Sequence, residues 1–258
     1  MAVDRPLLTI IVPALNEEGR LAQSVREALK AVSESGTTCE IIVVDDGSTD
    51  GTAEIAMRLA TEDPRLRVIR NPRNLGLGGA YKAGLVAAKG THVTWVPADV
   101  SHPADGLIPA YRAIGEADMI IPRPTNPEVR GWARRVVSGL YTKIINLGTG
   151  FKVPYYNGLT VHRVDLLRSI YLKTDSFGFQ AEAITKLLFL GATYKVVDTY
   201  ITERQVGRTK AFRIKNVIAV VRTLARILRL SLQRHLGASP ARLAMPPENR
   251  QARARSRK

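Results

Sequence analysis

The sequence has little of what would place a protein in an oxidising compartment or inside a membrane. It contains one cysteine, Cys39, in 258 residues, which excludes an intrachain disulfide and a cysteine-based zinc site. We therefore expect a reducing compartment. No apolar run is long enough to cross a bilayer, and the first run, at residues 7–12, is too short for a secretory signal. Any contact with a membrane is therefore expected to be peripheral.

Acidic residues are almost missing from the last fifth of the chain. Residues 210–258 hold thirteen Lys and Arg residues against one acid, Glu248, so this segment carries +12 of the net charge of +15. The body keeps the charge balance of an ordinary soluble domain, and 45% hydrophobic residues are sufficient for a core. We expect the C-terminal segment to meet whichever anionic partner the charge serves.

Ahead of that segment, short apolar runs alternate with helical stretches. We expect strands at residues 7–12, 40–44, 66–70 and 92–96, with helices at 20–33, 52–61 and 74–89 between them. The four β-branched residues at 41–44 are typical of a strand buried on both faces of a parallel sheet. The alternation predicts βαβ units with right-handed crossovers. Less regular elements follow, with strands at 119–123 and 194–201 and helices at 131–147 and 177–190.

Polar side chains follow three of the predicted strands. They are Glu17, Asp45, Asp46 and Asp99. Because the carboxyl ends of parallel strands lie at one edge of a sheet, we expect these groups to meet there, beside the glycine-rich helix start at Gly76. Such a set suits a nucleotide and a divalent cation. Ser48 or Thr49 is expected to cap the helix that follows from Thr52. Taken alone, the Asp-Asp-Gly segment is equally consistent with a solvated turn between strand and helix.

Four motifs stand in a specific order across the first hundred residues. They are VPALNEE at 12–18, VVDDGSTDGT at 43–52, NLG at 74–76 and ADVSHP at 98–103. Their order and spacing resemble glycosyltransferase family 2, and most closely its dolichol-phosphate mannose synthase and polyprenyl-phosphate glycosyltransferase branch. The resemblance implies an α/β protein of the GT-A fold, with a mostly parallel central sheet flanked by helices. It also implies transfer of a sugar from a nucleotide-sugar to a lipid phosphate.

The resemblance implies roles for individual residues. Pro13, Leu15 and Glu17 would line the nucleoside pocket, and Asp46 would hold the base or the ribose. Asp99 would bind the Mg²⁺ or Mn²⁺ ion that bridges the diphosphate. The remaining members of the implied donor-binding set are Asp45, Gly76 and Ala98.

Two positions depart from the family pattern. The usual Asp-x-Asp is Pro97-Ala98-Asp99 here, which removes one hard oxygen ligand. Asp99, the Ser101 hydroxyl, diphosphate oxygens and water would then complete the coordination, since magnesium keeps several waters. Weaker metal binding, a metal-independent reaction and lost activity are each compatible with this change. Val153 stands where an acid is usual, shortly before the Asn157-Gly158-Leu159 segment near the sugar, so the sugar is left open.

Basic residues in the second half are candidates for the acceptor phosphate. Arg123 ends a predicted strand at a place where an arginine meets phosphate in the resembled branch; an ordinary surface arginine is the alternative. Arg204 and Lys210 match the family's Arg-x-x-Gly-x-Ser-Lys loop, with Thr in place of Ser, and both can converge on one phosphate. Glu182, in the first turn of its helix, is expected either to cap the helix or to contact the sugar.

The C-terminal segment has a helical pattern over residues 211–235. Basic residues gather on one face and apolar residues on the other, which is typical of a helix lying in a membrane interface. The basic set is Lys215, Arg222, Arg226 and Arg229, and the apolar set is Val217, Val220, Val221, Leu224, Ile227 and Leu228. An amphipathic helix docked on the core is the alternative. No aromatic residue interleaves the cations, which disfavours nucleic acid.

These observations predict three units: a GT-A transferase domain at 1–210, a basic amphipathic interfacial helix at 211–236 and a basic disordered tail at 237–258. We predict an inverting hexosyltransferase that uses GDP-mannose or a UDP-sugar and a dolichyl or undecaprenyl phosphate. It would lie on the cytoplasmic face of a membrane and contact anionic lipid through residues 211–258. The alternatives are a family 2 transferase with a non-lipid acceptor and a non-catalytic sugar-nucleotide or membrane-binding relative. A polysaccharide synthase is disfavoured because no Gln-x-x-Arg-Trp occurs.

Overall fold

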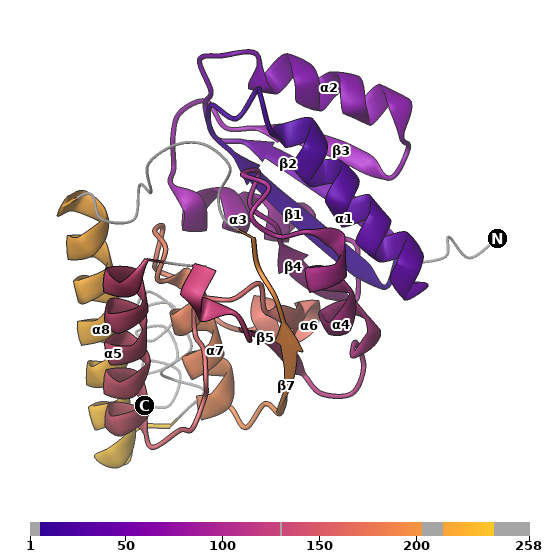
Figure 1. Cartoon of the computed structure of the whole chain (residues 1–258). Helices are drawn as coiled ribbons and strands as arrows, with labels where there is room; N and C mark the ends of the chain where they lie inside the picture. Colours follow the sequence, from indigo (N-terminus) through magenta and orange to yellow (C-terminus); the bar gives the residue numbers. More distant parts are fainter. Residues whose placement is uncertain (1–5, 130, 203–213, 240–258) are drawn as a thin grey trace, which may run out of the picture.

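The computed structural model describes residues 6–129, 131–202 and 214–239 (Figure 1). The elements predicted for the first hundred residues are confirmed, with ends shifted by a few residues. Helix α4 was not predicted, because Pro103 and Pro109 interrupt its helical pattern. The first half comprises β1 (Leu8–Ala14), α1 (Leu21–Ser35), β2 (Cys39–Asp45), α2 (Thr52–Glu62), β3 (Leu66–Arg70), α3 (Leu77–Ala87), β4 (His92–Trp95) and α4 (Ala104–Arg112).

The second half mixes longer helices with short strands. Strand β6 and helix α6 were not predicted, because three and five residues carry too little periodicity to be recognised. The elements are β5 (Met119–Pro124), the 3-10 turn η1 (Pro127–Val129), α5 (Trp132–Thr149), β6 (Val161–Arg163), α6 (Val164–Arg168), α7 (Phe179–Phe189), β7 (Tyr194–Thr199) and α8 (Ile214–His235).

The seven strands form one sheet in the order β3-β2-β1-β4-β6-β5-β7. Strands β3, β2, β1 and β4 run parallel, β7 is parallel to β5, and only β6 is antiparallel to its neighbours. The predicted mostly parallel sheet is therefore confirmed. All of β2 is buried, as is β1 apart from Pro13, which accounts for their uninterrupted apolar runs.

Helices flank the sheet, and α5 and α8 stand side by side at the left of Figure 1, apart from α1 and α2. One side of α8 packs against α5 and α7, with Ile227 fully buried and Val220 and Leu224 partly buried. The docked alternative therefore describes Val220, Leu224 and Ile227 correctly, whereas Val217 and Val221 of the same predicted lipid-facing set are exposed. Within the described parts of the chain, no helix combines the length and apolar content needed to cross a membrane.

The predicted side-chain cap of α2 is wrong. Gly51 is the N-cap residue, and the Thr52 backbone N–H donates to Asp50 Oδ1 at 3.1 Å instead. Ser48 is not available because its hydroxyl oxygen accepts a hydrogen bond from the Asn16 backbone N–H at 3.0 Å. The serine therefore joins two loops rather than capping a helix.

Candidate active site

The loops that follow β1 and β2 are joined at the carboxyl edge of the sheet. The Asp46 N–H donates to Ala14 O at 2.8 Å, and the Glu17 N–H donates to the Thr52 hydroxyl at 2.9 Å. The Glu17 carboxylate accepts from Arg20 Nε at 2.9 Å. The parallel register therefore brings the predicted Glu17 and Asp46 segments onto neighbouring strand ends, as their positions in the sequence required.

Asp46 is engaged inside the protein. Its buried carboxylate accepts hydrogen bonds from Asn71 Nδ2 at 2.8 Å and from the backbone N–H groups of Leu75 and Gly76, each at 2.9 Å. The carboxylate therefore fixes the loop that leads into α3. Contact of Asp46 with a base or ribose remains a prediction.

The glycine-rich start of α3 serves close packing. A Cβ on Gly76 would lie 2.6 Å from Asp175 O, and one on Gly78 would lie 2.5 Å from Thr174 O. The Gly78 N–H donates to Asp175 O at 2.9 Å. The backbone N–H groups at the start of α3, which were expected to bind a nucleotide, thus donate to Asp46 and to Asp175. The glycines lack a Cβ, and this lets the 174–175 segment pack closely against them.

Asp45 introduces a feature that the sequence analysis missed. Its fully buried Oδ1 accepts the Ser48 N–H at 3.0 Å, while Oδ2 has no hydrogen bond and lies 3.2 Å from Arg70 Nε. Arg70 sits opposite Asp45 in the register of β2 and β3, and it lines an open pocket together with Gly47, Ser48, Thr49, Asn71 and Pro72. Opposite charges at the ends of two adjacent predicted strands were the signal available for this pair.

Asp99 lies in a turn that is anchored to α1. Its Oδ1 accepts hydrogen bonds from the Ser101 hydroxyl at 2.5 Å and from the Ser101 N–H at 3.2 Å. The Val100 N–H donates to Ser24 Oγ at 3.0 Å, and Ala104 N–H donates to Glu27 Oε2 at 2.8 Å. These contacts hold the turn beside the β1 loop.

Two residues along this edge have positive φ, and one of them is strained. Among the described residues, the non-glycine residues with positive φ are Asn16, at 55°, and Val100, at 59°. A β-branched residue such as Val100 adopts this region at a cost, and such strain is concentrated at functional sites. Asn16, a residue type that adopts positive φ readily, precedes Glu17, and the strained Val100 follows Asp99, so the strain coincides with one predicted site residue.

A metal ion would depend on Asp99 and Ser101, whose oxygens are adjacent. Pro97 offers no side-chain ligand, and no group of three or more His, Cys, Asp or Glu side chains suited to a metal occurs in the described part of the chain. This donor set fits an ion that arrives with a diphosphate and keeps water ligands. It does not fit a site built from protein ligands alone.

Arg123 and Glu182 are both ion-paired. Arg123 donates to Asp198 Oδ1 through two nitrogens, at 2.6 and 2.9 Å, on the exposed ends of β5 and β7. The buried Glu182 accepts from Lys186 Nζ at 2.6 Å. A direct role for either in binding phosphate or sugar remains a prediction.

Glu182 also holds the loop ahead of α7. Its two oxygens accept the backbone N–H groups of Lys173 at 3.1 Å and Thr174 at 2.9 Å. Burial would raise the pKa of Glu182, but the charge of Lys186 and these hydrogen bonds together hold it below its usual value. The carboxylate therefore stays ionised and fixes the segment that packs on Gly76 and Gly78.

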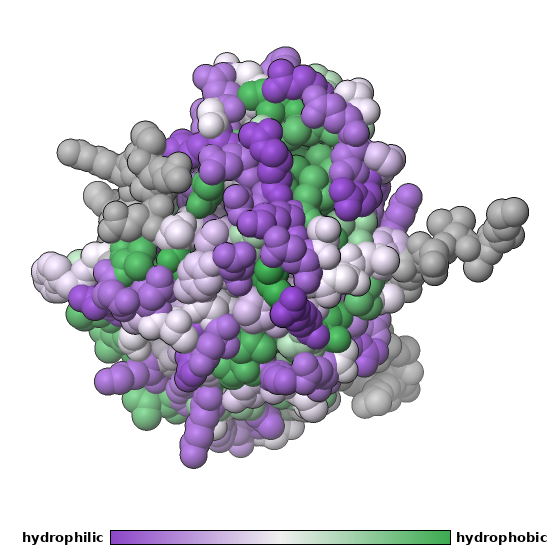
Figure 2. All heavy atoms as spheres, turned by 45° about the vertical axis from the view of Figure 1, so that its right-hand side comes forward, coloured by the Kyte–Doolittle hydropathy of each residue, from purple (hydrophilic) through white to green (hydrophobic). Residues whose placement is uncertain are grey.

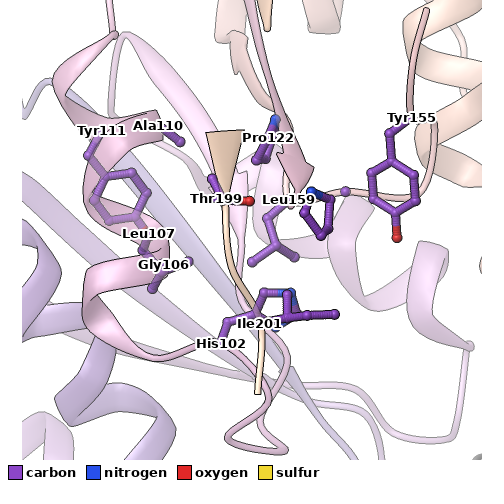
Figure 3. Close-up of a pocket in the computed structure, with 12 residues that line it drawn as sticks. His102, Gly106, Leu107, Ala110, Tyr111, Pro122, Tyr155, Leu159, Thr199 and Ile201 are labelled. Atoms are coloured by element: carbon purple, nitrogen blue, oxygen red, sulfur yellow. The ribbon is translucent and has the colours of Figure 1, made fainter. Parts of the chain in front are cut away.

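A second pocket lies between α4, the end of β5 and the 155–159 segment (Figure 3). In Figure 3, Tyr111 and Leu107 stand on one side, Tyr155 on the other, and His102 and Ile201 below. The predicted sugar-side segment contributes Gly158 and Leu159. Neither of the two pockets is lined by Glu17, Asp46 or Asp99. The predicted phosphate ligands Arg204 and Lys210 lie outside the described residues.

The fold defines the structural class: the sheet and its flanking helices match solved structures of the GT-A fold. A glucosyl-3-phosphoglycerate synthase from Mycobacterium tuberculosis matches with a TM-score of 0.64 and 19% identity, over 88% of this chain and 80% of that one. A mannosyltransferase from Pyrobaculum calidifontis, in complex with GDP-Man and Mn²⁺, matches with a TM-score of 0.58 and 19% identity, over 93% and 78%. These likenesses concern the fold.

The chain belongs to glycosyl transferase family 2, whose model matches residues 9–165. An undecaprenyl-phosphate mannosyltransferase from Micrococcus luteus is 31% identical over 78% of this chain and 85% of its own length. A dolichyl-phosphate beta-glucosyltransferase from Dictyostelium discoideum is 35% identical, but over 38% of this chain and 32% of its own length. The chain thus spans most of the first relative and about a third of the second.

Proposed function

We propose that the protein transfers a hexose from a nucleotide-sugar to a polyprenyl phosphate, with inversion at the anomeric carbon. The support from comparison is the likeness to the Micrococcus luteus transferase along most of both chains. The structural observation that carries the proposal is the backbone of the sheet edge, where Asn16 with positive φ precedes Glu17 and the strained Val100 follows Asp99.

The proposed reaction does not require a general base from the protein. A phosphate monoester has a second pKa near ~6, so a polyprenyl phosphate is largely a dianion at neutral pH and is already a nucleophile. Its oxygen attacks the anomeric carbon as the bond to the nucleoside diphosphate breaks on the opposite side. An α-linked donor then gives a β-linked lipid-phosphate sugar. The protein contributes position and charge.

The residues divide between the two substrates. Glu17 and the Pro13-to-Leu15 segment line the donor side in this proposal, with Asp45, Asp46, Gly76 and Ala98 behind them. Asp99 and Ser101 hold a Mg²⁺ or Mn²⁺ ion, which neutralises charge on the leaving diphosphate when it is bound. Arg123, Arg204 and Lys210 hold the acceptor phosphate.

A polyprenyl-phosphate acceptor would lie in a membrane, so the proposed reaction implies attachment to a membrane surface. We infer peripheral attachment at the cytoplasmic face of a membrane, with the basic segment 211–258 attracted to anionic lipid. The charge of this segment supports the inference, because each Lys or Arg near an anionic surface contributes about 1 kcal/mol.

Transfer to undecaprenyl phosphate tests the proposal, with GDP-mannose and UDP-glucose offered separately and with and without Mn²⁺. A β-linked sugar phosphate by NMR is the expected product; an α-linked product from an α-linked donor would exclude direct displacement. Pro97 motivates the alternative of a non-catalytic binder. A donor that raises the melting temperature but is never consumed, with or without Mn²⁺, would favour that alternative.

A further inference from the structure

The two helices α5 and α8 share one side of the molecule. They lie in contact, because Ser231 Oγ donates to Gly148 O at 2.6 Å and Leu228 packs where a side chain at Gly148 would be. Ser231, Thr223 and Ile227 are buried in this contact and in the contact with α7. The docked side of α8 is therefore unavailable to any other partner.

Large apolar side chains remain exposed on the outer side of both helices. On α5, Trp132 is 73% exposed and Leu147 is 86% exposed. The exposed positions recur at helical spacing, with Trp132, Val136 and Leu140 each one turn apart. We call the combined set the α5–α8 face: Trp132, Val136, Val137, Leu140 and Leu147 from α5, and Val217, Ile218, Val221, Leu232 and the adjoining Leu236 from α8.

Exposed apolar residues elsewhere are scattered. Met57 on α2 and Val86 on α3 are examples, and single residues of this kind are normal on a protein surface. The side shown in Figure 2 is largely hydrophilic over its upper part, with apolar atoms in narrow strips between polar ones. A gathered set such as the α5–α8 face marks an interaction site.

The charges on these helices select the partner. Neither α5 nor α8 contains an Asp or Glu, whereas together they contain Arg134, Arg135, Lys143, Lys215, Arg222, Arg226, Arg229 and Arg234. Arg135, Lys143, Arg222 and Arg229 are exposed. A second copy of the chain would bring two all-basic surfaces together. A lipid surface offers hydrocarbon to the apolar side chains and phosphate to the cations beside them.

We propose that the α5–α8 face inserts into the headgroup region of an anionic bilayer, with α5 supplying as much of the contact as α8. The membrane contact is therefore a two-helix surface rather than the C-terminal segment alone. This inference rests on the peripheral attachment proposed above and does not depend on which sugar is transferred.

Trp132 provides a direct test, because the only other tryptophan, Trp95, is buried. Full-length protein is mixed with phosphatidylglycerol–phosphatidylcholine vesicles whose acyl chains are brominated. We expect a blue shift and quenching of tryptophan emission, kept in Trp95→Phe and lost in Trp132→Phe. Vesicle-bound protein whose Trp132 emission neither shifts nor quenches would overturn the proposal.

Binding to vesicles provides a quantitative test. Removing apolar contact in Leu140→Ser/Leu147→Ser should lower the vesicle partition coefficient by about tenfold or more. Arg222→Gln/Arg229→Gln should lower it by roughly fivefold per cation at low salt. The matched control Met57→Ser/Val86→Ser removes equally exposed apolar groups outside the face and should bind as the wild type does. Equal losses in the control and the face variants would contradict a specific face.

Two further measurements keep this test separate from other outcomes. Thermal unfolding of the face variants should match the wild type, and transfer to a water-soluble short-chain acceptor without vesicles should be unchanged. Absence of transfer in every variant and the wild type, with vesicle binding intact, would reject the proposed function alone. A concentration-dependent dimer that Leu140→Ser abolishes, with vesicle binding intact, would instead assign the face to a second copy.

Discussion

The carboxyl edge of β1–β4 and the α5–α8 layer differ in where their side chains find partners. At the edge, polar side chains are buried and bonded inward; Asp46 alone accepts three hydrogen bonds from the protein. In the α5–α8 layer, apolar side chains such as Trp132 and Leu147 face outward. The first arrangement holds loops in one geometry, and the second leaves a surface without a partner inside the chain. The difference indicates that the sheet edge fixes the loops of the candidate site, whereas the α5–α8 layer provides a surface for an outside partner.

The largest effect is expected where the two regions meet, at the buried Glu182–Lys186 pair. Lys186→Met leaves a buried carboxylate without its partner, which costs about 3–5 kcal/mol of unfolding free energy. Urea unfolding measures the loss. A loss below about 1 kcal/mol would show that the pair does not hold the loop ahead of α7.

The same pair predicts a pH dependence. Because the folded-state pKa of Glu182 lies below its unfolded value, its contribution is present above the unfolded pKa, about 4.3, and is lost as pH falls through the folded pKa. The difference in unfolding free energy between the wild type and Glu182→Gln should therefore be constant near neutral pH and shrink below about pH 4. A difference that grows on acidification would contradict this sign.

The next effect concerns Asp46. Asp46→Ala leaves buried donors on Asn71 and on the loop before α3 unpaired, which costs roughly 3 kcal/mol of unfolding free energy. Donor binding should weaken with it, because the loop loses its anchor. Asp46→Asn, which retains one acceptor oxygen, should lose less; equal losses in both variants would point to the charge rather than to the hydrogen bonds.

Asp99 should separate activity from stability. Asp99→Ala is expected to lower the transfer rate about a hundredfold or more, about 2.7 kcal/mol, in line with losing one electrostatic group at a reacting centre. Its unfolding free energy should change by less than about 1 kcal/mol, because the Asp99 side chain is only partly buried and its hydrogen bonds with Ser101 lie within one turn. Turnover that survives the substitution would remove Asp99 from the proposed metal site.

The smallest effect is expected at Asp198. The Arg123–Asp198 pair is exposed on both sides, so Asp198→Asn should change stability by less than about 1 kcal/mol. It should also lower KM for the phosphate acceptor by releasing Arg123, with kcat little changed. A higher KM would mean that Asp198 orients Arg123 rather than competing with the acceptor.

Most of the parallel part of the sheet was predictable because β1 and β2 carry uninterrupted apolar runs, and because β3 and β4 follow at regular spacing after helical stretches. The four motifs also placed Glu17, Asp46 and Asp99 on one edge. The partners of the candidate site residues were not predictable, since other segments supply them: Asn71 binds Asp46, Thr174 binds Glu182 and Asp198 binds Arg123. Strand β6 was missed because three residues have no usable period. The apolar pattern of α8 identified a helix but could not say which side its neighbours would cover.

The segment around Thr174 and Asp175 touches both regions at once. Thr174 Oγ1 lies 3.3 Å from the Thr223 hydroxyl and from a guanidinium nitrogen of Arg226 on α8, while Asp175 O binds the Gly78 N–H and its carboxylate binds Lys82 on α3. Two consecutive residues thus connect α8 to α3 through hydrogen bonds. A displacement of α8 would therefore be expected to act on Gly78, two residues beyond the Gly76 N–H that Asp46 holds.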